Sequence, residues 1–426
     1  MRPFTIPLLL MGCWFLASPA GAQNFPRPDE LPVRRELPDP LVMLDGTPVS
    51  TPEQWAKQRR PELKQLFQHY MYGYMPAAPQ EVKSNIERVS SDYFGGKATK
   101  REVTISFGPD GTPPIHLLVI VPNKKSGPVP VFVGLNFGGN HTVTEDAEVP
   151  LPTVWMYPHR KGVVDNRATE EARGSDVDVW CAETLIDRGY ALATFYNGDI
   201  DPDRPDFTDG VHPHYFQPGQ SQPGPRDWGT IAAWAWGLSR AVDYLVSADD
   251  IDAQRVCAIG HSRLGKTALL AGAFDERIAL VVPHQSGTGG CALSRENDQE
   301  TIERINRVFP HWFSDTFPQF DGREDRLPID QHLLIALVAP RPLMDTEGDQ
   351  DTWANYDNAW KAVQAADRVY KFLGARGLVG NEPLHGDEPI TPESCGELVQ
   401  YRRDSKHELN RDYWLRILDF ADARLK

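Results

Sequence analysis

The sequence has few cysteines, no basic tract and no long apolar segment beyond its first twenty or so residues. Only 5 of its 426 residues are cysteine, which excludes a disulfide-dense scaffold, and a chain of this length can bury a core without cross-links. A formal net charge of −15 argues against nucleic acid as a partner, because polyanions are bound by clustered lysines and arginines. No stretch after residue 22 is apolar enough to cross a membrane, and no cysteine or histidine spacing indicates a metal site. We therefore expect a soluble, globular protein that needs no metal.

The N-terminus has the pattern of an export signal. Met1-Arg2 is followed by an apolar stretch over residues 7–17 and then by Ala20-Gly21-Ala22. A positive start, a short apolar core and an A-x-A exit are typical of a secretory signal peptide, which we predict over residues 1–22. A lipoprotein site at Cys13 fits less well, because the apolar run continues past it. The mature protein is expected to be secreted or periplasmic.

Removal of the signal would leave four cysteines in the mature chain. Four cysteines allow three pairings, and the sequence does not choose among them. Cys257 lies in an apolar segment, where a buried free thiol is the simplest interpretation. The remaining three are Cys181, Cys291 and Cys395.

Short apolar segments alternate with helical patterns along the chain. Strand-like segments lie at 102–107, 115–121, 129–136, 190–196, 255–259, 278–282 and 341–344, and helical patterns lie at 51–74, 227–248, 354–373 and 412–424. This alternation predicts an α/β fold with a mostly parallel sheet covered by helices on both faces. We expect one domain over residues 23–426, with a proline-rich extended arm at 23–45. Loops at 140–180, 200–225 and 286–330 would decorate the carboxyl edge of the sheet.

The run RVCAIGHSRLGKTALLAGAFD, from Arg255 to Asp275, carries the strongest chemical signal. An apolar strand, a tight turn with Ser262 and a helix of small residues are typical of a nucleophile elbow. Gly260 and Gly265 would let the backbone double back closely. The motif here is G-x-S-x-x-G and not the commoner G-x-S-x-G, because Leu264 occupies the position of the usual second glycine. Taken alone, the pattern leaves an ordinary turn serine as the alternative.

A serine hydrolase on such a sheet needs a serine, an acid and a histidine in that order. His385 lies in a polar loop after a strand-like segment at 369–373, and we predict that it is the general base. For the acid, the segment after residues 341–344 offers a G-x-x-D pattern ending at Asp351. Asp349 and Glu347 are neighbouring alternatives, and a solvated acidic loop is the simplest interpretation without catalysis.

Several longer segments carry a resemblance to a known family. They are residues 134–142, 188–203, 260–266, 286–290, 309–313 and 330–342, and they follow one another in the expected order. Together they resemble the glucuronoyl esterases, carbohydrate esterase family 15, and the bacterial members in particular. The resemblance implies an α/β-hydrolase fold and hydrolysis of esters between (4-O-methyl)glucuronic acid on xylan and alcohols, including lignin alcohols.

The resemblance also implies roles for single residues. Ser262 and Arg263 match the serine–arginine pair of the family, and the N–H and guanidinium of Arg263 would stabilise the oxyanion. Lys266, Glu300 and Trp353 match residues that contact the sugar.

One position departs from the family pattern. Many members have the triad glutamate directly before the Ser-Gly-x-Gly-Gly segment, where this chain has Gln285. Glutamine cannot carry the charge that stabilises an imidazolium ion. Some bacterial relatives hold an acid in the later D-x-W loop, which here favours Asp351.

The sequence thus predicts a monomeric serine esterase that acts through an acyl-enzyme on Ser262 without a cofactor. Its expected substrate is glucuronoxylan or a lignin–carbohydrate ester. A different carbohydrate esterase, such as an acetyl xylan esterase, is one alternative. A non-catalytic sugar-binding relative is another. This alternative arises because Gln285 stands where many family members have their triad glutamate.

Overall fold

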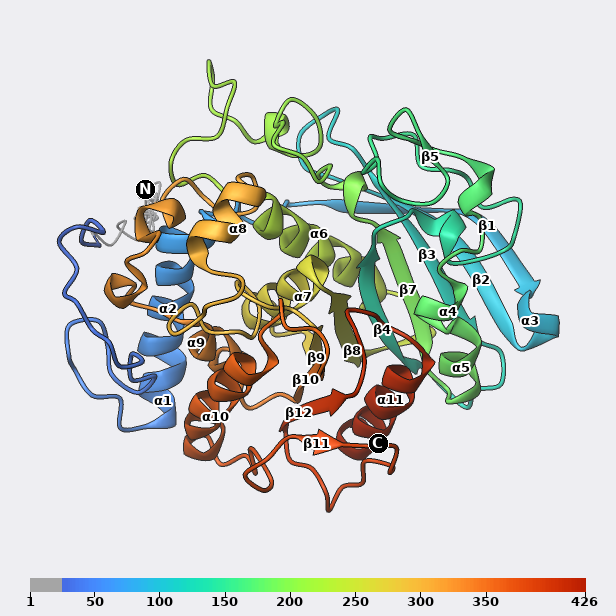
Figure 1. Cartoon of the computed structure of the whole chain (residues 1–426). Helices are drawn as coiled ribbons and strands as arrows, with labels where there is room; N and C mark the ends of the chain where they lie inside the picture. The colour runs from blue at the N-terminus through green and yellow to red at the C-terminus, as the bar shows by residue number, and fades with distance from the viewer. Residues whose placement is uncertain (1–24) are drawn as a thin grey trace, which may run out of the picture.

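A computed structural model describes residues 25–426 of the chain, and the predicted signal peptide lies outside them. Within these residues, ten strands form one central sheet in the order β1-β2-β3-β7-β4-β8-β9-β10-β12-β11 (Figure 1). The strands from β7 to β11 in this order run parallel, and β1, β2 and β3 are antiparallel at one edge. The strands are β1 (Val82–Asp92), β2 (Ala98–Phe107), β3 (Ile115–Pro122), β4 (Val129–Asn136), β7 (Ala191–Tyr196), β8 (Ile251–His261), β9 (Ile278–His284), β10 (Leu343–Gly348), β11 (Leu384–His385) and β12 (Leu398–Arg403).

Helices cover both faces of this sheet (Figure 1). One layer contains α2 (Arg60–Phe67), α6 (Thr230–Leu245), α7 (Arg263–Phe274), α9 (Gln331–Ala336) and α10 (Tyr356–Phe372). The other layer contains α4 (Val177–Trp180), α5 (Ala182–Asp187) and α11 (Arg411–Leu425). Short elements outside these layers are α1 (Pro52–Gln54), α3 (Tyr93–Gly96), α8 (Ile302–Val308) and the two-stranded sheet of β5 (Val163–Val164) and β6 (Arg167–Ala168).

Alternation along the strands divides the apolar side chains between two cores. On β4, Val131 and Val133 belong to the core under α6 and α7, whereas Phe132 belongs to the core under α11. On β8, Val256 faces the first core and Cys257 the second. A strand that is buried on both faces reads as a continuous apolar run, which is why these strands were predictable. The α/β-hydrolase fold is confirmed.

The secondary structure differs from the sequence prediction in several places, of which the following bear on the site or on the N-terminal helical run. The segment 369–373, predicted as strand-like, is the last turn of α10 and the residue that follows it. Strands β1 and β12 were not predicted at all. The predicted helix at 51–74 is one helical run from Pro52 to Tyr72, in which two π-helical turns flank α2.

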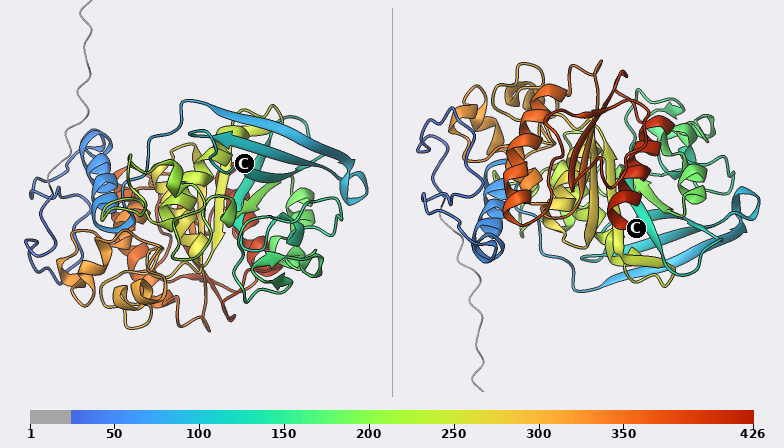
Figure 2. Two further views of the ribbon diagram at one scale, coloured as in Figure 1. Left: turned by 90° about the horizontal axis from the view of Figure 1, so that it is seen from above. Right: turned by 90° about the horizontal axis from the view of Figure 1, so that it is seen from below.

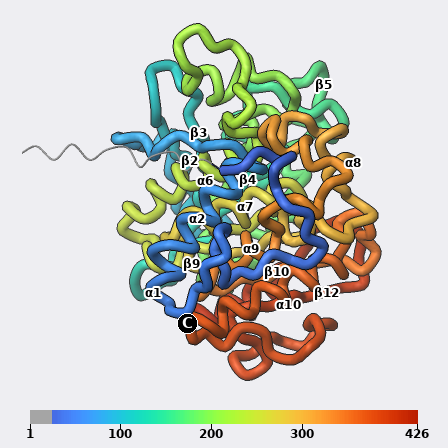
Figure 3. Tube along the Cα trace, turned by 90° about the vertical axis from the view of Figure 1, so that its left-hand side faces the viewer, coloured from blue at the N-terminus to red at the C-terminus, as the bar shows by residue number. Residues whose placement is uncertain are grey.

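The N-terminal segment after residue 24 runs in extended conformation along the helical layer. Tyr70 of the helical run donates a hydrogen bond to the Pro26 carbonyl (2.7 Å), and His332 of α9 lies 2.8 Å from the Pro38 carbonyl. Figure 3 shows this dark-blue segment crossing the side of the molecule formed by α2 and α9. Both views of Figure 2 place it at the opposite end of the molecule from β1 and β2.

Two further observations concern export and cross-linking. No helix within residues 25–426 is long and apolar enough to span a bilayer. All four cysteines of these residues are free, and Cys257, Cys291 and Cys395 are buried. The expectation of a buried free thiol at Cys257 is confirmed.

Candidate active site

Ser262 lies at the turn between β8 and α7, as an elbow requires. Its backbone has φ 59° and ψ −128°, a conformation that costs a non-glycine residue free energy and is found at functional turns. The turn is held by backbone hydrogen bonds, because the Ser262 N–H donates to the His284 carbonyl (2.9 Å) and the Gly265 N–H donates to the Ser262 carbonyl (2.8 Å). The predicted strand–turn–helix layout is confirmed.

The two glycines of the elbow are required by close backbone contacts. A Cβ atom on Gly260 would lie 1.9 Å from the Leu264 carbonyl oxygen. A Cβ atom on Gly265 would lie 2.9 Å from the His284 carbonyl oxygen. The helix therefore packs directly on the strand that carries the serine, and no side chain fits between them.

His385 does not lie near Ser262, so its prediction as the general base is wrong. It is in β11 at the edge of the sheet, and it is exposed. The strand register runs from His261 on β8 through β9, β10 and β12 to Leu384 on β11. Four steps of about 4.8 Å separate these positions by roughly 19 Å. The error followed from the segment 369–373, which was interpreted as the last strand although it belongs to α10.

The histidine that faces the elbow is His407, in the loop between β12 and α11. Its Nδ1 lies 2.5 Å from Oδ2 of Asp351, and its ring packs edge to face on the ring of His261, with centroids 4.4 Å apart. Ser262 and His407 line the same cavity. An imidazole whose Nδ1–H donates to a carboxylate leaves Nε2 free to accept a proton.

Asp351 is the carboxylate that the structure brings to a histidine. It lies three residues beyond the end of β10, and only 5% of its surface is exposed. Glu347, an alternative acid, is fully buried within β10, and neither of its carboxylate oxygens has a hydrogen-bond partner. Burial and the neighbouring Asp345 raise the pKa of Glu347 well above its usual range. Asp349, the other alternative, has no histidine partner among the described residues.

Arg263, the residue after the serine, is held on the other side of the elbow. Its guanidinium pairs with Asp203 and lies 4.7 Å from the ring centroid of Trp312 and 4.9 Å from that of Phe309, two rings that stack on each other. Asp203 also accepts hydrogen bonds from Nε2 of His311 (2.9 Å) and Nε1 of Trp312 (2.8 Å). Burial opposes the charge of Asp203, but the bond from His311 and the Arg263 charge outweigh it and lower the pKa of Asp203. As the first residue of α7, Arg263 has a backbone N–H without an intrahelical acceptor.

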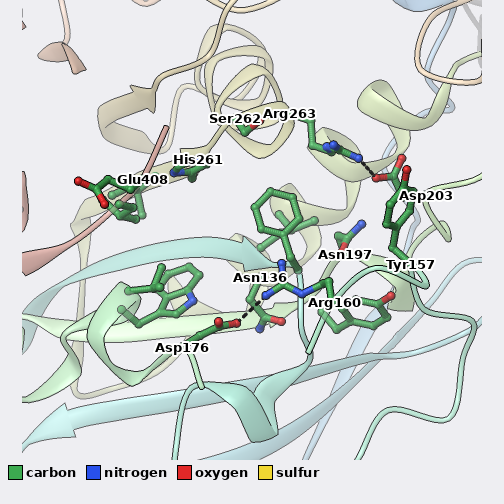
Figure 4. A pocket seen from close by; sticks show the side chains of 18 of the residues that line it. Asn136, Tyr157, Arg160, Asp176, Asn197, Asp203, His261, Ser262, Arg263 and Glu408 are labelled. Atoms are coloured by element: carbon green, nitrogen blue, oxygen red, sulfur yellow. Dashed lines mark hydrogen bonds and ion pairs between the residues drawn. The ribbon is translucent and has the colours of Figure 1, made fainter. Parts of the chain in front are cut away.

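A cavity of about 450 Å³ opens beside Ser262. Figure 4 shows Glu408, His261, Ser262 and Arg263 along one wall, with Asp176 and Arg160 opposite. Tyr157 lies beside Arg263, with its ring centroid 6.0 Å from the guanidinium. Arg160 is paired with Asp176 (3.0 Å). The cavity is also lined by the aromatic side chains Phe137, Trp180 and Tyr196. Polar groups thus gather near the serine, while much of the remaining lining is aromatic.

Lys266, Glu300 and Trp353 form a connected group behind this wall. The Lys266 ammonium donates to Oε2 of Glu300 (3.0 Å) and to the carbonyls of Ser286 and Thr288, and Trp353 Nε1 donates to Oε1 of Glu300 (3.0 Å). Lys266 and Glu300 are buried, whereas Trp353 is 41% exposed. Burial lowers the pKa of Lys266. The structure brings the three predicted residues together, but they do not line the cavity beside Ser262.

Two groups of this site were not assigned from the sequence. Asp203 lies in the segment 188–203 that carried the family resemblance, but nothing in the sequence indicated that it pairs with Arg263. His407 follows β12, whose sequence LVQYRR does not show the apolar run of a central strand. A histidine shortly after the last strand is the signal that could have found it.

The sheet order and the elbow define the chain as an α/β-hydrolase. A family model described as "Glucuronyl esterase, fungi" matches residues 179–374. A relative named Carbohydrate esterase MZ0003, from an unknown prokaryotic organism, is 44% identical over 396 residues, which are 91% of this chain and 89% of the relative. The chain therefore belongs to the glucuronoyl esterase family, carbohydrate esterase family 15, and is a carboxylic ester hydrolase.

Solved structures agree with this membership. A promiscuous esterase of the same family from a marine bacterial metagenome has a TM-score of 0.84 and 42% identity, and the match covers 93% of this chain and 99% of that one. A glucuronoyl esterase from Solibacter usitatus has a TM-score of 0.85 and 37% identity, and the match covers 93% of this chain and 100% of that one. The resemblance to bacterial members of the family is confirmed.

Replacing Gly260 by alanine is expected to distort the elbow. The added Cβ would lie 1.9 Å from the Leu264 carbonyl oxygen, and relieving such a clash costs about 3 kcal/mol. Thermal unfolding should therefore show a fall of several degrees in the melting temperature. Gly127→Ala is the matched control, because no heavy atom lies within 4 Å of its added Cβ. Equal melting temperatures for the two variants would contradict the close packing of strand and helix.

Breaking the Lys266–Glu300 pair from one side is expected to destabilise the fold. Removing one partner of a buried ion pair leaves the other charge uncompensated and costs about 3–5 kcal/mol. Lys266→Met should show this loss in urea unfolding, and Lys266→Met/Glu300→Gln should regain a large part of it. If the double variant were no more stable than Lys266→Met, the two side chains would not be coupled.

Proposed function

We propose that this protein hydrolyses esters of (4-O-methyl)glucuronic acid on glucuronoxylan, with Ser262 as nucleophile, His407 as general base and Asp351 as the acid of the triad. The observation that carries the proposal is the 2.5 Å contact between Asp351 and His407, in the wall of the cavity that Ser262 lines. The names of the family members, glucuronoyl esterases and 4-O-methyl-glucuronoyl methylesterases, support the substrate class.

The geometry supports an acyl-enzyme route. Nε2 of His407 takes the proton of the Ser262 hydroxyl while the oxygen attacks the ester carbonyl, and Asp351 stabilises the imidazolium that forms. The developing oxyanion is stabilised by the backbone N–H of Arg263 and by its guanidinium, which Asp203 and Trp312 hold in place. His407 then gives the proton to the leaving alcohol. Water, activated by the same histidine, hydrolyses the acyl-enzyme and releases the uronate.

The two sides of the elbow suggest where the two halves of the substrate bind. Trp353 and Glu300 form a partly exposed polar group of the kind that binds sugar hydroxyls. The Lys266 ammonium fixes Glu300 by donating a hydrogen bond to its carboxylate. Tyr157, Trp180 and other aromatic side chains line the cavity beside Ser262, which the first group does not line. We propose that the sugar lies by Trp353 and that the cavity accepts the alcohol, including the aromatic alcohols of lignin.

We also propose that residues 1–22 direct export and that the mature enzyme is a monomer that acts outside the cytoplasm. The export part of this proposal rests on the charge and apolar pattern of the N-terminus. Mass spectrometry of the enzyme from its native host should give a chain that begins at Gln23. A mature chain that still carried Met1 would contradict it.

The function is tested with a benzyl ester of glucuronic acid, its methyl ester and acetylated xylan as substrates. The wild-type enzyme is expected to hydrolyse the benzyl ester with the highest kcat/KM and acetylated xylan with the lowest. On the benzyl ester, Ser262→Ala and His407→Ala should lose at least about 10⁴-fold in kcat, and Asp351→Asn about 10³- to 10⁴-fold.

His385→Ala is the matched control for this series, because it removes an exposed histidine at the sheet edge and should leave kcat unchanged. Full activity of His407→Ala would overturn the proposed base. Preference for acetylated xylan would favour an acetyl xylan esterase, and equal, negligible rates for wild type and Ser262→Ala would favour a sugar-binding relative without catalysis.

A further inference from the structure

Gln285 occupies the position where many family members have their triad glutamate, and its side chain contacts the loop of His407. It follows the last residue of β9, with φ 45° and only 1% of its surface exposed. Its Nε2 donates to the Lys406 carbonyl (2.9 Å), and its Oε1 accepts from the Glu408 N–H (2.8 Å). The amide thus binds the backbone on both sides of His407.

We propose that Gln285 is a positioning residue, which fixes the backbone at His407 so that the imidazole faces Ser262 and Asp351 together. The inference rests on the proposed role of His407 as the general base. The Gln285 side chain is hydrogen-bonded to the residues on both sides of His407. The backbone of His407 therefore has little freedom to shift or to rotate. Small displacements of a catalytic group reduce turnover strongly, so this constraint bears directly on kcat.

The chemistry of the contact requires an amide. One end of the side chain must donate to a carbonyl, and the other end must accept from an N–H. A carboxamide does both at once, whereas a carboxylate can only accept. A carboxylic acid, with its proton in place, can again do both. Gln285 is therefore not an inactive replacement for an acid, because its amide has a structural task that an ionised glutamate cannot perform.

The residue before it, His284, binds the same loop. Its Nε2 lies 2.8 Å from the Glu408 carbonyl, and its Nδ1 lies 2.7 Å from the hydroxyl of Thr346. Burial lowers the pKa of His284 to about 3, so the ring is neutral, and the carbonyl partner assigns its proton to Nε2. Because His284 remains in place when Gln285 is altered, the loop should be displaced rather than unfolded.

The surroundings of the Gln285 amide would disfavour a charge. The Tyr413 hydroxyl of α11 lies 3.5 Å from its Nε2 and itself donates to the Glu347 carbonyl of β10. A Cβ atom on Gly348 would lie 2.7 Å from the same Nε2, so the amide is closely packed. The titratable side chains around it are the acids Asp351 and Glu347, the phenol of Tyr413, and the imidazoles of His284 and His407. Burial and the neighbouring acids would raise the pKa of a carboxyl introduced here.

These features give a sharp test in the variant Gln285→Glu, assayed on the benzyl ester over a range of pH. Only the protonated form of the new carboxyl can donate to the Lys406 carbonyl. Relative to the wild type at the same pH, activity should therefore be retained at low pH and lost as pH rises through the raised pKa of this group. The expected loss is at least about tenfold in kcat, with KM little changed, because the sugar contacts lie elsewhere. The wild type should show no such loss of activity as pH rises through the same range.

Gln68→Glu is a matched control. Gln68 makes the same kind of contact, since its Nε2 donates to the Lys64 carbonyl (3.4 Å) and its Oε1 accepts from the Met75 N–H (3.1 Å). It belongs to the N-terminal helical run and does not line the cavity. This variant should lose some thermal stability but keep the pH profile of the wild type. Gln285→Met, which removes both hydrogen bonds without adding a titratable group, should lower kcat at every pH.

Two outcomes separate this inference from the proposed function. If Gln285→Glu and Gln285→Met lowered the melting temperature but kept the kcat and pH profile of the wild type, Gln285 would be merely structural and the inference would be overturned. If His407→Ala kept its activity, the proposed base would be wrong, whatever the Gln285 variants showed. The inference stands if His407→Ala is inactive, both Gln285 variants lower kcat, and Gln285→Glu alone changes its pH dependence, while Gln68→Glu changes neither.

Discussion

The hydrogen bond between Asp351 and His407 joins two loops that follow neighbouring strands of the sheet, β10 and β12. Its geometry depends on features well outside the pair itself. Parallel strands end at the same edge of a sheet, so the carboxylate and the imidazole arrive at one place without a long connection. The elbow after β8 presents Ser262 at that edge as well. A site assembled this way takes its precision from strand register, and the loops need to be held only at a few points.

The second side of the site is organised by charge and aromatic packing. Arg263 is held by a carboxylate from one loop and by rings from another, so its guanidinium is fixed before any substrate binds. Preorganisation of this kind avoids the cost of reorienting dipoles as charge develops on the ester oxygen. The ion pair with Asp203 also offsets part of the positive charge. In the proposed mechanism, Arg263 is therefore better suited to stabilising a transient oxyanion than to retaining the uronate product, which is an anion.

The fold could be predicted from the sequence wherever strands are apolar throughout. In β4, and in residues 256–260 of β8, every residue is buried, and the apolar sequence shows it. In β12, Gln400 and Arg402 are buried through polar contacts, with Asp345 and Asp357 respectively, so the strand reads as a polar segment. The loss of this one strand moved the expected histidine to His385. Short sequence motifs contain Ser262, Asp351 and the group around Glu300. Such motifs can be recognised without knowing the strand order, so these residues were predicted although the strand assignment was incomplete.

The four free thiols have a consequence for where this protein can be produced. Of these cysteines, Cys257, Cys291 and Cys395 are buried, and burial raises the pKa of each, which makes the reactive thiolate scarce. Within residues 25–426 no covalent cross-link supports the fold, so the redox potential of the surroundings does not enter its stability. Folding of these residues therefore needs no oxidant to form a disulfide, whether the chain is made in a reducing or an oxidising compartment.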